Sequence, residues 1–148
     1  MSKVLAVASG GGHWEQLMRL REAFDGHDIT FATTDADLPE RSGITRSVVL
    51  PDCNRDEPLR ALRCLLASAA LVLRLRPDVI VSTGAAPGLL CIAIGRLTGA
   101  RTLWVDSVAN AERLSMSGKL AMKLAHRTLT QWEHLARPDG PEYAGAVL

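Results

Sequence analysis

The chain has 148 residues, a length that suits one domain with a hydrophobic core and leaves little room for a second. Lys and Arg total 17 against 16 Asp and Glu, and this formal charge of +1 gives no basis for broad nucleic-acid binding. Hydrophobic residues make up 47 % of the sequence, which is typical of a globular chain and argues against disorder.

Short apolar runs alternate along the chain with segments of helical spacing. The runs predict six strands, at residues 3–9, 28–34, 46–50, 78–82, 101–106 and 127–131. Helices are predicted at residues 13–24 and 58–76, from a turn containing Gly84, Pro87 and Gly88 through Leu97, and, after a cap at Ser117, to Ala125, with loops at 35–43 and 51–56. Strands alternating with helices imply a parallel sheet with helices on both faces. The predicted fold is one α/β domain over residues 1–148, a Rossmann-like parallel sheet of about six strands.

The cysteines, Cys53, Cys64 and Cys91, are odd in number and widely spaced, so we expect free thiols in a reducing compartment and no zinc pair. The chain opens with a short apolar run that reaches Gly10 too early for the core of a signal peptide. A cytoplasmic protein is therefore expected.

Three consecutive glycines, Gly10, Gly11 and Gly12, follow the first predicted strand and precede a helix. Ligands of such sheets bind beyond the carboxyl ends of the strands, where a helix N-terminus favours phosphate. His13 at the helix start is a candidate phosphate contact or general base, because histidine titrates near neutral pH. Glu15 is a second candidate base. A ligand-free turn, an exposed histidine and a glutamate that only favours the helix dipole remain as alternatives.

Two other phosphate-binding motifs have glycines at comparable positions. The P-loop pattern is absent, because no Gly-Lys-Ser/Thr follows the glycines. The dinucleotide fingerprint half fits, since Gly10 and Gly12 match it, Glu15 replaces its third glycine and Asp35 stands near the place of its ribose-binding acid. An NAD(P)-binding module therefore remains an alternative. No metal or other cofactor is expected, because no carboxylate cluster is recognised in the sequence.

Three stretches of the chain, in order, resemble one protein family. "SGGGHWEQLMRL" is similar to the opening of PssD-type bacterial polysaccharide-assembly proteins, "RPDVIVSTGAAPG" to a strand and turn of that family, and "AHRTLTQWEHL" to a later strand. The segment that follows the second stretch is similar to a further part of the family pattern, with Asp106 in place of a Glu and Asn110 near an expected Arg, and the last stretch has His126 in place of an Asp. The eukaryotic relatives of the family are the membrane-recruiting subunit of the transferase that extends dolichyl-diphosphate-GlcNAc.

The resemblance implies a fold and a function. The family is similar to the N-terminal half of a GT-B glycosyltransferase such as the lipid II synthase, and this chain ends about where such enzymes enter their second half. That half holds a polyprenyl-diphosphate-linked acceptor, and a separate UDP-sugar-binding partner completes a heterodimer. Gly10, Gly11 and Gly12 would cradle the diphosphate, and an inverting transfer would follow. Further expected acceptor contacts are Gly84, Ala85, Ser107 and Asn110. A scaffold that only recruits a catalytic partner remains an alternative, as does a plain strand-to-helix turn at Gly84.

The predicted helix at 58–76 contains an uncharged run flanked by arginines. A bilayer-spanning helix needs about 20 apolar residues, so this helix is too short to cross. It is either buried, or it packs on the sheet with one side and dips into a membrane surface with the other. For the second case the expected membrane contacts are Arg60, Arg63, Leu66 and Arg74. The chain is then peripheral on the inner face of the plasma membrane.

Overall fold

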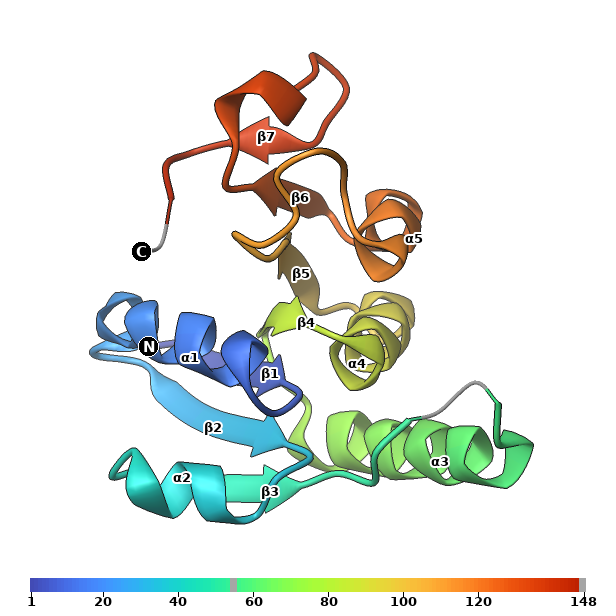
Figure 1. Cartoon of the computed structure of the whole chain (residues 1–148). Helices are drawn as coiled ribbons and strands as arrows, with labels where there is room; N and C mark the ends of the chain where they lie inside the picture. Colours follow the sequence, from blue (N-terminus) through green and yellow to red (C-terminus); the bar gives the residue numbers. More distant parts are fainter. Residues whose placement is uncertain (54–55, 147–148) are drawn as a thin grey trace.

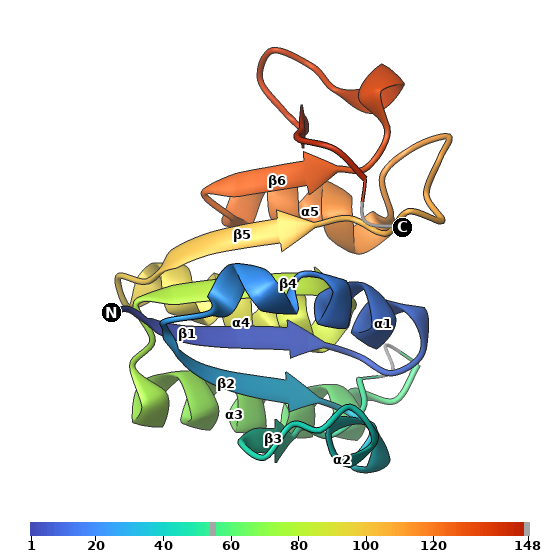
Figure 2. The same cartoon turned by 90° about the vertical axis from the view of Figure 1, so that its left-hand side faces the viewer.

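The computed structural model describes residues 1–53 and 56–146 and contains one parallel sheet of seven strands. The strands lie in the order β3-β2-β1-β4-β5-β6-β7 (Figures 1 and 2). Their bounds are β1 Lys3–Ala8, β2 Asp28–Thr33, β3 Ser47–Val49, β4 Val79–Gly84, β5 Arg101–Val105, β6 Arg127–Thr130 and β7 Glu142–Tyr143. The predicted α/β class and the six predicted strands are confirmed, and β7 is an additional strand at the edge of the sheet.

Helices cover the two faces of the sheet unequally (Figure 1). On one face, α3 (Pro58–Leu75), α4 (Ala86–Leu97) and α5 (Met116–Leu124) lie side by side. On the other face lie α1 (Gly12–Arg19), the 3-10 turn η1 (Arg21–Phe24) and the short helix α2 (Asp37–Arg41). A second 3-10 turn, η2 (Glu133–Leu135), follows β6.

The central strands β1 and β4 are buried on both sides, as expected for a parallel sheet with helices on both faces. Because side chains alternate along a strand, Leu5 and Val7 pack towards α3 and α4, whereas Ala6 and Ala8 pack against Trp14 of α1. The core therefore fixes α1 directly over the centre of the sheet.

Three predictions about local structure were wrong. The helix expected at 13–24 ends at Arg19, and its second half is the 3-10 turn η1. The segment 35–43, expected to be a loop, contains the short helix α2. Pro39 is compatible with this helix because it lies in the first turn, where the N–H that proline lacks has no helical partner. The cap of α5 is Ser115 and not Ser117, since the Ser115 hydroxyl accepts a hydrogen bond from the Gly118 N–H at 2.9 Å.

The three cysteines are free, as expected. Cys64 and Cys91 are buried between α3 and α4, and Cys53 is half-buried in the loop that precedes α3. Burial raises the pKa of the Cys64 thiol to about 11 and that of Cys91 to about 12. Both buried thiols are therefore neutral packing groups at physiological pH.

The chain order of the strands reverses between β1 and β4, which are neighbours in the sheet. From β1 the chain winds outwards through β2 to β3, and from β4 it winds the other way to β7. All strands point to the same edge, so the loops that follow β1, β4, β5 and β6 gather there (Figure 2). A doubly wound sheet binds its ligands at this edge, next to the reversal.

Candidate functional site

The loops after β1 and β4 are joined by hydrogen bonds at the strand reversal. The Ser9 N–H donates to the Gly84 carbonyl at 2.8 Å, and the Ala85 N–H donates to the Ser9 hydroxyl at 3.1 Å. At the start of α1, the carbonyl of His13 accepts a hydrogen bond from the Thr83 hydroxyl at 2.6 Å. The two loops therefore form one connected surface.

The glycine loop presents free backbone donors to solvent. Gly11 has φ 69° and ψ −136°, a conformation that favours glycine, and it forms the N-cap of α1 without any side-chain cap. Gly11 and Gly12 are exposed, and a Cβ atom on either one meets no atom within 4 Å. Among the residues that the structure describes, the N–H groups of Gly11, Gly12 and His13 have no hydrogen-bond partner. Such a helix N-terminus is suited to an anion.

The imidazole of His13 packs directly on Gly84. A Cβ atom added at Gly84 would lie only 2.5 Å from Nδ1 of His13, so the imidazole ring occupies the space that a side chain would need there. Nδ1 is 3.1 Å from the carbonyl oxygen of Thr83, which only accepts hydrogen bonds. Nδ1 therefore carries the proton, and the lone pair of the neutral ring is on Nε2. This tautomer places a proton acceptor beside the glycine loop.

The other predicted residues near these two loops do not contact the His13 ring in the way that Gly84 does. Glu15 is exposed in the first turn of α1. A Cβ atom added at Gly10 would be in ordinary van der Waals contact with Asp35 and Leu38. Ala85 is the N-cap of α4, which, like α1, begins without a side-chain cap. Asp35 accepts a hydrogen bond from the Asp37 N–H at 3.0 Å, beside the start of α2.

The loop after β5 is organised around the carboxylate of Asp106, which is only 2 % exposed. Its Oδ1 accepts from Trp104 Nε1 at 3.0 Å and from the Ser115 hydroxyl at 2.7 Å. Its Oδ2 accepts from the Ser115 N–H at 3.0 Å and from the amide of Asn110 at 3.3 Å. Ser107 is also buried, and its hydroxyl accepts from the side chain of Gln16 and from the Ala109 N–H. The structure thus places Asn110 and Ser107 in bonds that shape residues 106–115.

The sequence analysis missed Gln16. This side chain is 7 % exposed and connects α1 with the loop after β5 and with the end of β6. A glutamine one turn after a glycine loop gives no local signal of burial, because all of its partners lie at least 91 residues away in the sequence.

The helix α3 has one buried side and one exposed apolar side. Cys64, Ser68, Leu71 and Val72 face the core. Five leucines are exposed, with Leu59 at 74 % and Leu66 at 60 %; the others are Leu62, Leu65 and Leu73. The predicted contacts Arg60, Arg63 and Arg74 are exposed on the same helix, and Arg60 pairs with Glu57 at 2.7 Å. Within the described residues, no helix has the length and apolarity needed to span a bilayer.

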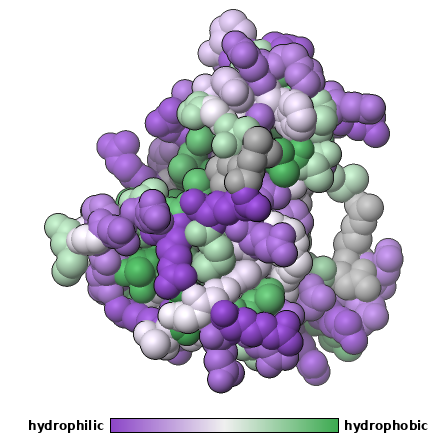
Figure 3. All heavy atoms as spheres, turned by 60° about the vertical axis from the view of Figure 1, so that its left-hand side comes forward, coloured by the Kyte–Doolittle hydropathy of each residue, from purple (hydrophilic) through white to green (hydrophobic). Residues whose placement is uncertain are grey.

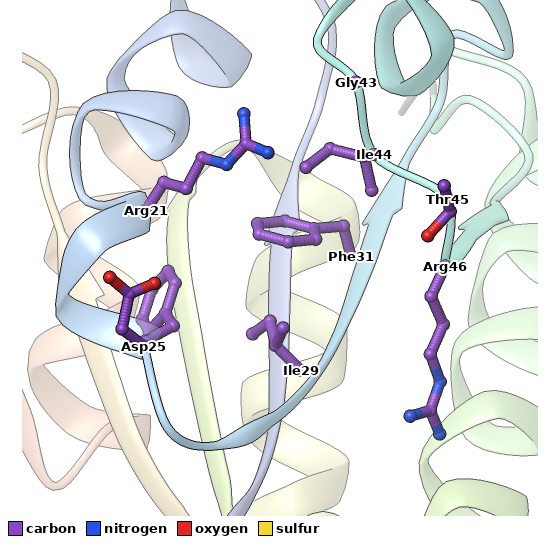
Figure 4. A pocket seen from close by; sticks show the side chains of 9 residues that line it. Arg21, Asp25, Ile29, Phe31, Gly43, Ile44, Thr45 and Arg46 are labelled. Carbon is purple, nitrogen blue, oxygen red and sulfur yellow. The ribbon is translucent and has the colours of Figure 1, made fainter.

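A separate cavity of about 320 Å³ lies between η1, β2 and residues 43–46 (Figure 4). Ile29 and Phe31 form its floor, and Arg21 and Arg46 stand on opposite sides of it. Both guanidinium groups already have partners, since Arg21 donates to the Ser42 carbonyl and Arg46 pairs with Asp28. The residues that line this cavity do not include those of the glycine loop.

The strand reversal with its glycine loop can be compared with known proteins. A model of the family described as "Oligosaccharide biosynthesis protein Alg14 like" matches residues 44–147. The chain belongs to this Alg14-like family. The resemblance to a subunit of this kind is therefore confirmed.

Two fungal members of the family align with almost the whole chain. The UDP-N-acetylglucosamine transferase subunit alg14 of Schizosaccharomyces pombe is 26 % identical, over 97 % of this chain and 82 % of its own length. The corresponding subunit of Yarrowia lipolytica is 24 % identical, over 99 % of this chain and 81 % of its own.

Solved structures show which larger fold the Alg14-like chain resembles. MurG of Acinetobacter baumannii superposes with a TM-score of 0.76 at 12 % identity, over 97 % of this chain and 45 % of MurG. UDP-N-acetylglucosamine 2-epimerase of Rickettsia bellii gives a TM-score of 0.70 at 13 % identity, over 90 % of this chain and 40 % of the epimerase. The chain thus spans less than half of these proteins, which confirms the expected likeness of fold to one half of a GT-B enzyme.

Proposed function

We propose that this chain is the acceptor-binding, membrane-associating subunit of a two-component glycosyltransferase. The complex transfers a sugar from a UDP-sugar to a polyprenyl-diphosphate-linked saccharide. The observation that carries the proposal is the glycine loop, in which N–H groups without a hydrogen-bond partner among the described residues lie beside the ring of His13, whose Nε2 carries the lone pair. Membership of the Alg14-like family and the names of its fungal relatives support the role of a transferase subunit.

The chemistry follows from the two kinds of group in the loop. The N–H groups of Gly11 and Gly12 and the positive end of the α1 dipole bind the acceptor diphosphate. Nε2 of His13 accepts the proton of the acceptor hydroxyl as its oxygen bonds to the anomeric carbon of the donor sugar. The bond from that carbon to the UDP oxygen breaks, UDP leaves as an anion, and the configuration inverts. Glu15 is the second candidate for the base.

Membrane association is supported by the outer side of α3 and by the distribution of charge. Leu59, Leu62, Leu66 and Leu73 recur at helical spacing on the exposed side of this helix. Residues 58–131 contain ten Lys and Arg but only three Asp and Glu, whereas the rest of the chain is acidic. Figure 3 shows the face on the α1 side, where hydrophilic residues predominate. An anionic membrane surface therefore attracts the side of the molecule that carries α3.

A partner subunit is supported by the surface of β5 and β6 on the α1 side of the sheet. There Leu103, Val105 and Leu129 line an apolar cavity of about 220 Å³, together with Leu20 and residues 144–146. A parallel sheet normally has both of its faces covered. A UDP-sugar-binding subunit that docks at the carboxyl edge covers this surface.

Reconstitution of the transfer reaction tests the proposal. The chain is mixed with a candidate UDP-sugar-binding partner, anionic vesicles carrying polyprenyl-diphosphate-GlcNAc and a panel of radiolabelled UDP-sugars. We expect label in the lipid fraction only when both subunits are present. His13→Ala lowers the rate at least a hundred-fold, since general base catalysis contributes about 10²–10⁴-fold. Glu22→Gln, a change at an exposed carboxylate on η1, serves as the control for Glu15→Gln.

The same assay separates the alternatives. If His13→Ala and Glu15→Gln both retain the full rate and bind the partner normally, the subunit is a scaffold without catalytic groups. Transfer by the isolated chain contradicts the two-subunit account. Binding of NADH to the isolated chain, measured by calorimetry, favours the dinucleotide module, and its absence removes that alternative.

Vesicle sedimentation tests the membrane surface independently. The chain is expected to sediment with vesicles rich in phosphatidylglycerol and to remain in solution with phosphatidylcholine alone. Leu62→Asp with Leu66→Asp abolishes sedimentation, because both side chains lie on the exposed side of α3. Tyr143→Asp, at an exposed residue on the far edge of the sheet, is the matched control. Equal sedimentation of both variants contradicts the assignment of this surface to α3.

A further inference from the structure

Gln16 makes three hydrogen bonds from a buried side chain. Its Nε2 donates to the Ser107 hydroxyl at 3.0 Å, and its Oε1 accepts from the Val108 N–H at 3.2 Å. Oε1 also accepts from Nε2 of Gln131 at 2.5 Å, and that same nitrogen donates to the carbonyl of Asp106 at 2.9 Å. One side chain thus connects α1, the loop after β5 and the end of β6.

The first turns of α1 are therefore held at two points. His13 bonds to Thr83 at the end of β4, and Gln16, one turn later, bonds to residues beyond the ends of β5 and β6. The glycine loop lies immediately before these two contacts. Its free N–H groups and the His13 ring consequently have a fixed position relative to residues 106–115, which Asp106 holds together from within.

A buried amide is a costly choice if packing is its only role. An apolar side chain of similar size fills the same space without the desolvation cost of a polar group, whereas each hydrogen bond that a buried amide fails to make destabilises the fold. What the amide adds is direction, because its three bonds fix the rotation and the height of α1 against two other loops. Fixed donors of this kind are what binding and catalysis at a charged centre require.

We propose that Gln16 is the positioning residue of the site. It sets the glycine loop and His13 in register with the loop after β5, so that one acceptor molecule contacts both. This inference rests on the proposed function for its ligand, an organic diphosphate. It adds to that function a residue that does not itself touch the ligand.

The test uses the full chain and two readouts. The first is the ¹⁵N NMR spectrum of the His13 ring without any ligand, and the second is the affinity for inorganic pyrophosphate measured by calorimetry. Gln16→Met keeps the length of the side chain and removes its hydrogen bonds. We expect it to shift or broaden the His13 ring signals and to weaken pyrophosphate binding at least ten-fold at a temperature where the variant is folded.

Thr102→Val is the matched control for a merely structural role. The buried hydroxyl of Thr102 also bonds to a distant segment, at His126, but at the opposite edge of the sheet. It is expected to lower thermal stability by a similar amount and to leave both readouts unchanged. If Gln16→Met does not fold, Ser107→Ala, which removes one of the three bonds, is expected to move both readouts in the same direction by a smaller amount.

The outcomes distinguish this inference from the proposed function. If the His13 signals and the affinity of the folded variant match those of the unmodified chain, Gln16 only fills space and the inference is wrong. If the unmodified chain does not bind pyrophosphate, the proposed anion site is wrong. In that case the His13 signals alone still decide whether Gln16 positions the loop.

Discussion

Replacing Gly84 by Ala tests the contact on which the site is built. The φ angle of Gly84 is 122°, so any side chain there strains the backbone, at a cost of about 1–3 kcal/mol. The new methyl group also lies 2.5 Å from Nδ1 of His13 and must displace the ring. Displacement breaks the hydrogen bond to Thr83, worth about 1 kcal/mol. We therefore expect Gly84→Ala to lower the free energy of unfolding by about 3 kcal/mol.

A protein of this size loses roughly 2–4 °C in Tm per kcal/mol, so the expected shift in Tm is roughly 6–12 °C. Urea unfolding of four variants, forming a double-mutant cycle with His13→Ala, separates the two causes. With the ring removed, Gly84→Ala retains only its backbone strain, and its cost falls by about 1 kcal/mol. Gly12→Ala is the control, because Gly12 has no positive φ and its Cβ meets no neighbour.

Two results refute this reasoning. Equal costs of Gly84→Ala with and without the imidazole show that the ring does not occupy the space beside Gly84. A cost of Gly12→Ala as large as that of Gly84→Ala shows that the loop is tightly packed, and that its amides are not open to a ligand.

Three other predictions concern the rest of the chain. At pH 8 a disulfide reagent is expected to leave Cys64 and Cys91 unmodified until the protein unfolds, because burial raises their pKa values to about 11 and 12. Reaction of two or more thiols with the reagent in the folded protein contradicts this. A hydrogen bond from Arg127 lowers the pKa of the Glu142 carboxyl. The ion pair therefore stabilises the fold above the ordinary pKa of 4.5, and this stabilisation is lost as the pH falls through the lowered pKa. Glu142→Gln is expected to remove that part of the pH dependence of urea unfolding. Asp106→Ala leaves four donors without their acceptor. Since each unsatisfied buried donor costs about 1–3 kcal/mol, a loss of at least about 3 kcal/mol is expected in urea unfolding, and a loss below about 1 kcal/mol contradicts the network.

The elements that the sequence predicted well are those with a local signal. The run "DVIVS" is apolar on both sides of its pleat, and it is the central strand β4. The helix α3 was placed within a residue at its end, because Pro58 suits a first turn and Pro77 follows its last. The glycine loop was placed at a helix start because three glycines after an apolar run have few other uses.

The features that the sequence did not predict depend on distant partners. β7 has two residues, and only its ladder with β6 makes it a strand. Both Ser115 and Ser117 have the chemistry of a cap, and the choice of Ser115 depends on its bonds to Asp106. Gln16 is a polar residue in a short amphipathic helix, where exposure is the ordinary expectation. Its burial is decided by segments that approach α1 only in the folded sheet.

The helices that begin at the carboxyl edge of the sheet differ in how their first N–H groups are satisfied. The N-terminus of α5 is closed by the hydroxyl of Ser115, which Asp106 holds in place. The helices α1 and α4 begin without side-chain caps, and they follow β1 and β4, the two strands between which the chain order reverses. The helices α2 and α3 also lack a side-chain cap at their N-caps, but the Asp37 N–H of α2 donates to Asp35 and α3 begins with Pro58, which has no N–H. The uncapped starts of α1 and α4 are the two that flank the strand reversal. In the proposed function, a diphosphate at this reversal lies next to His13, so the proposed attacking hydroxyl belongs to a sugar joined directly to that diphosphate or to a short saccharide on it.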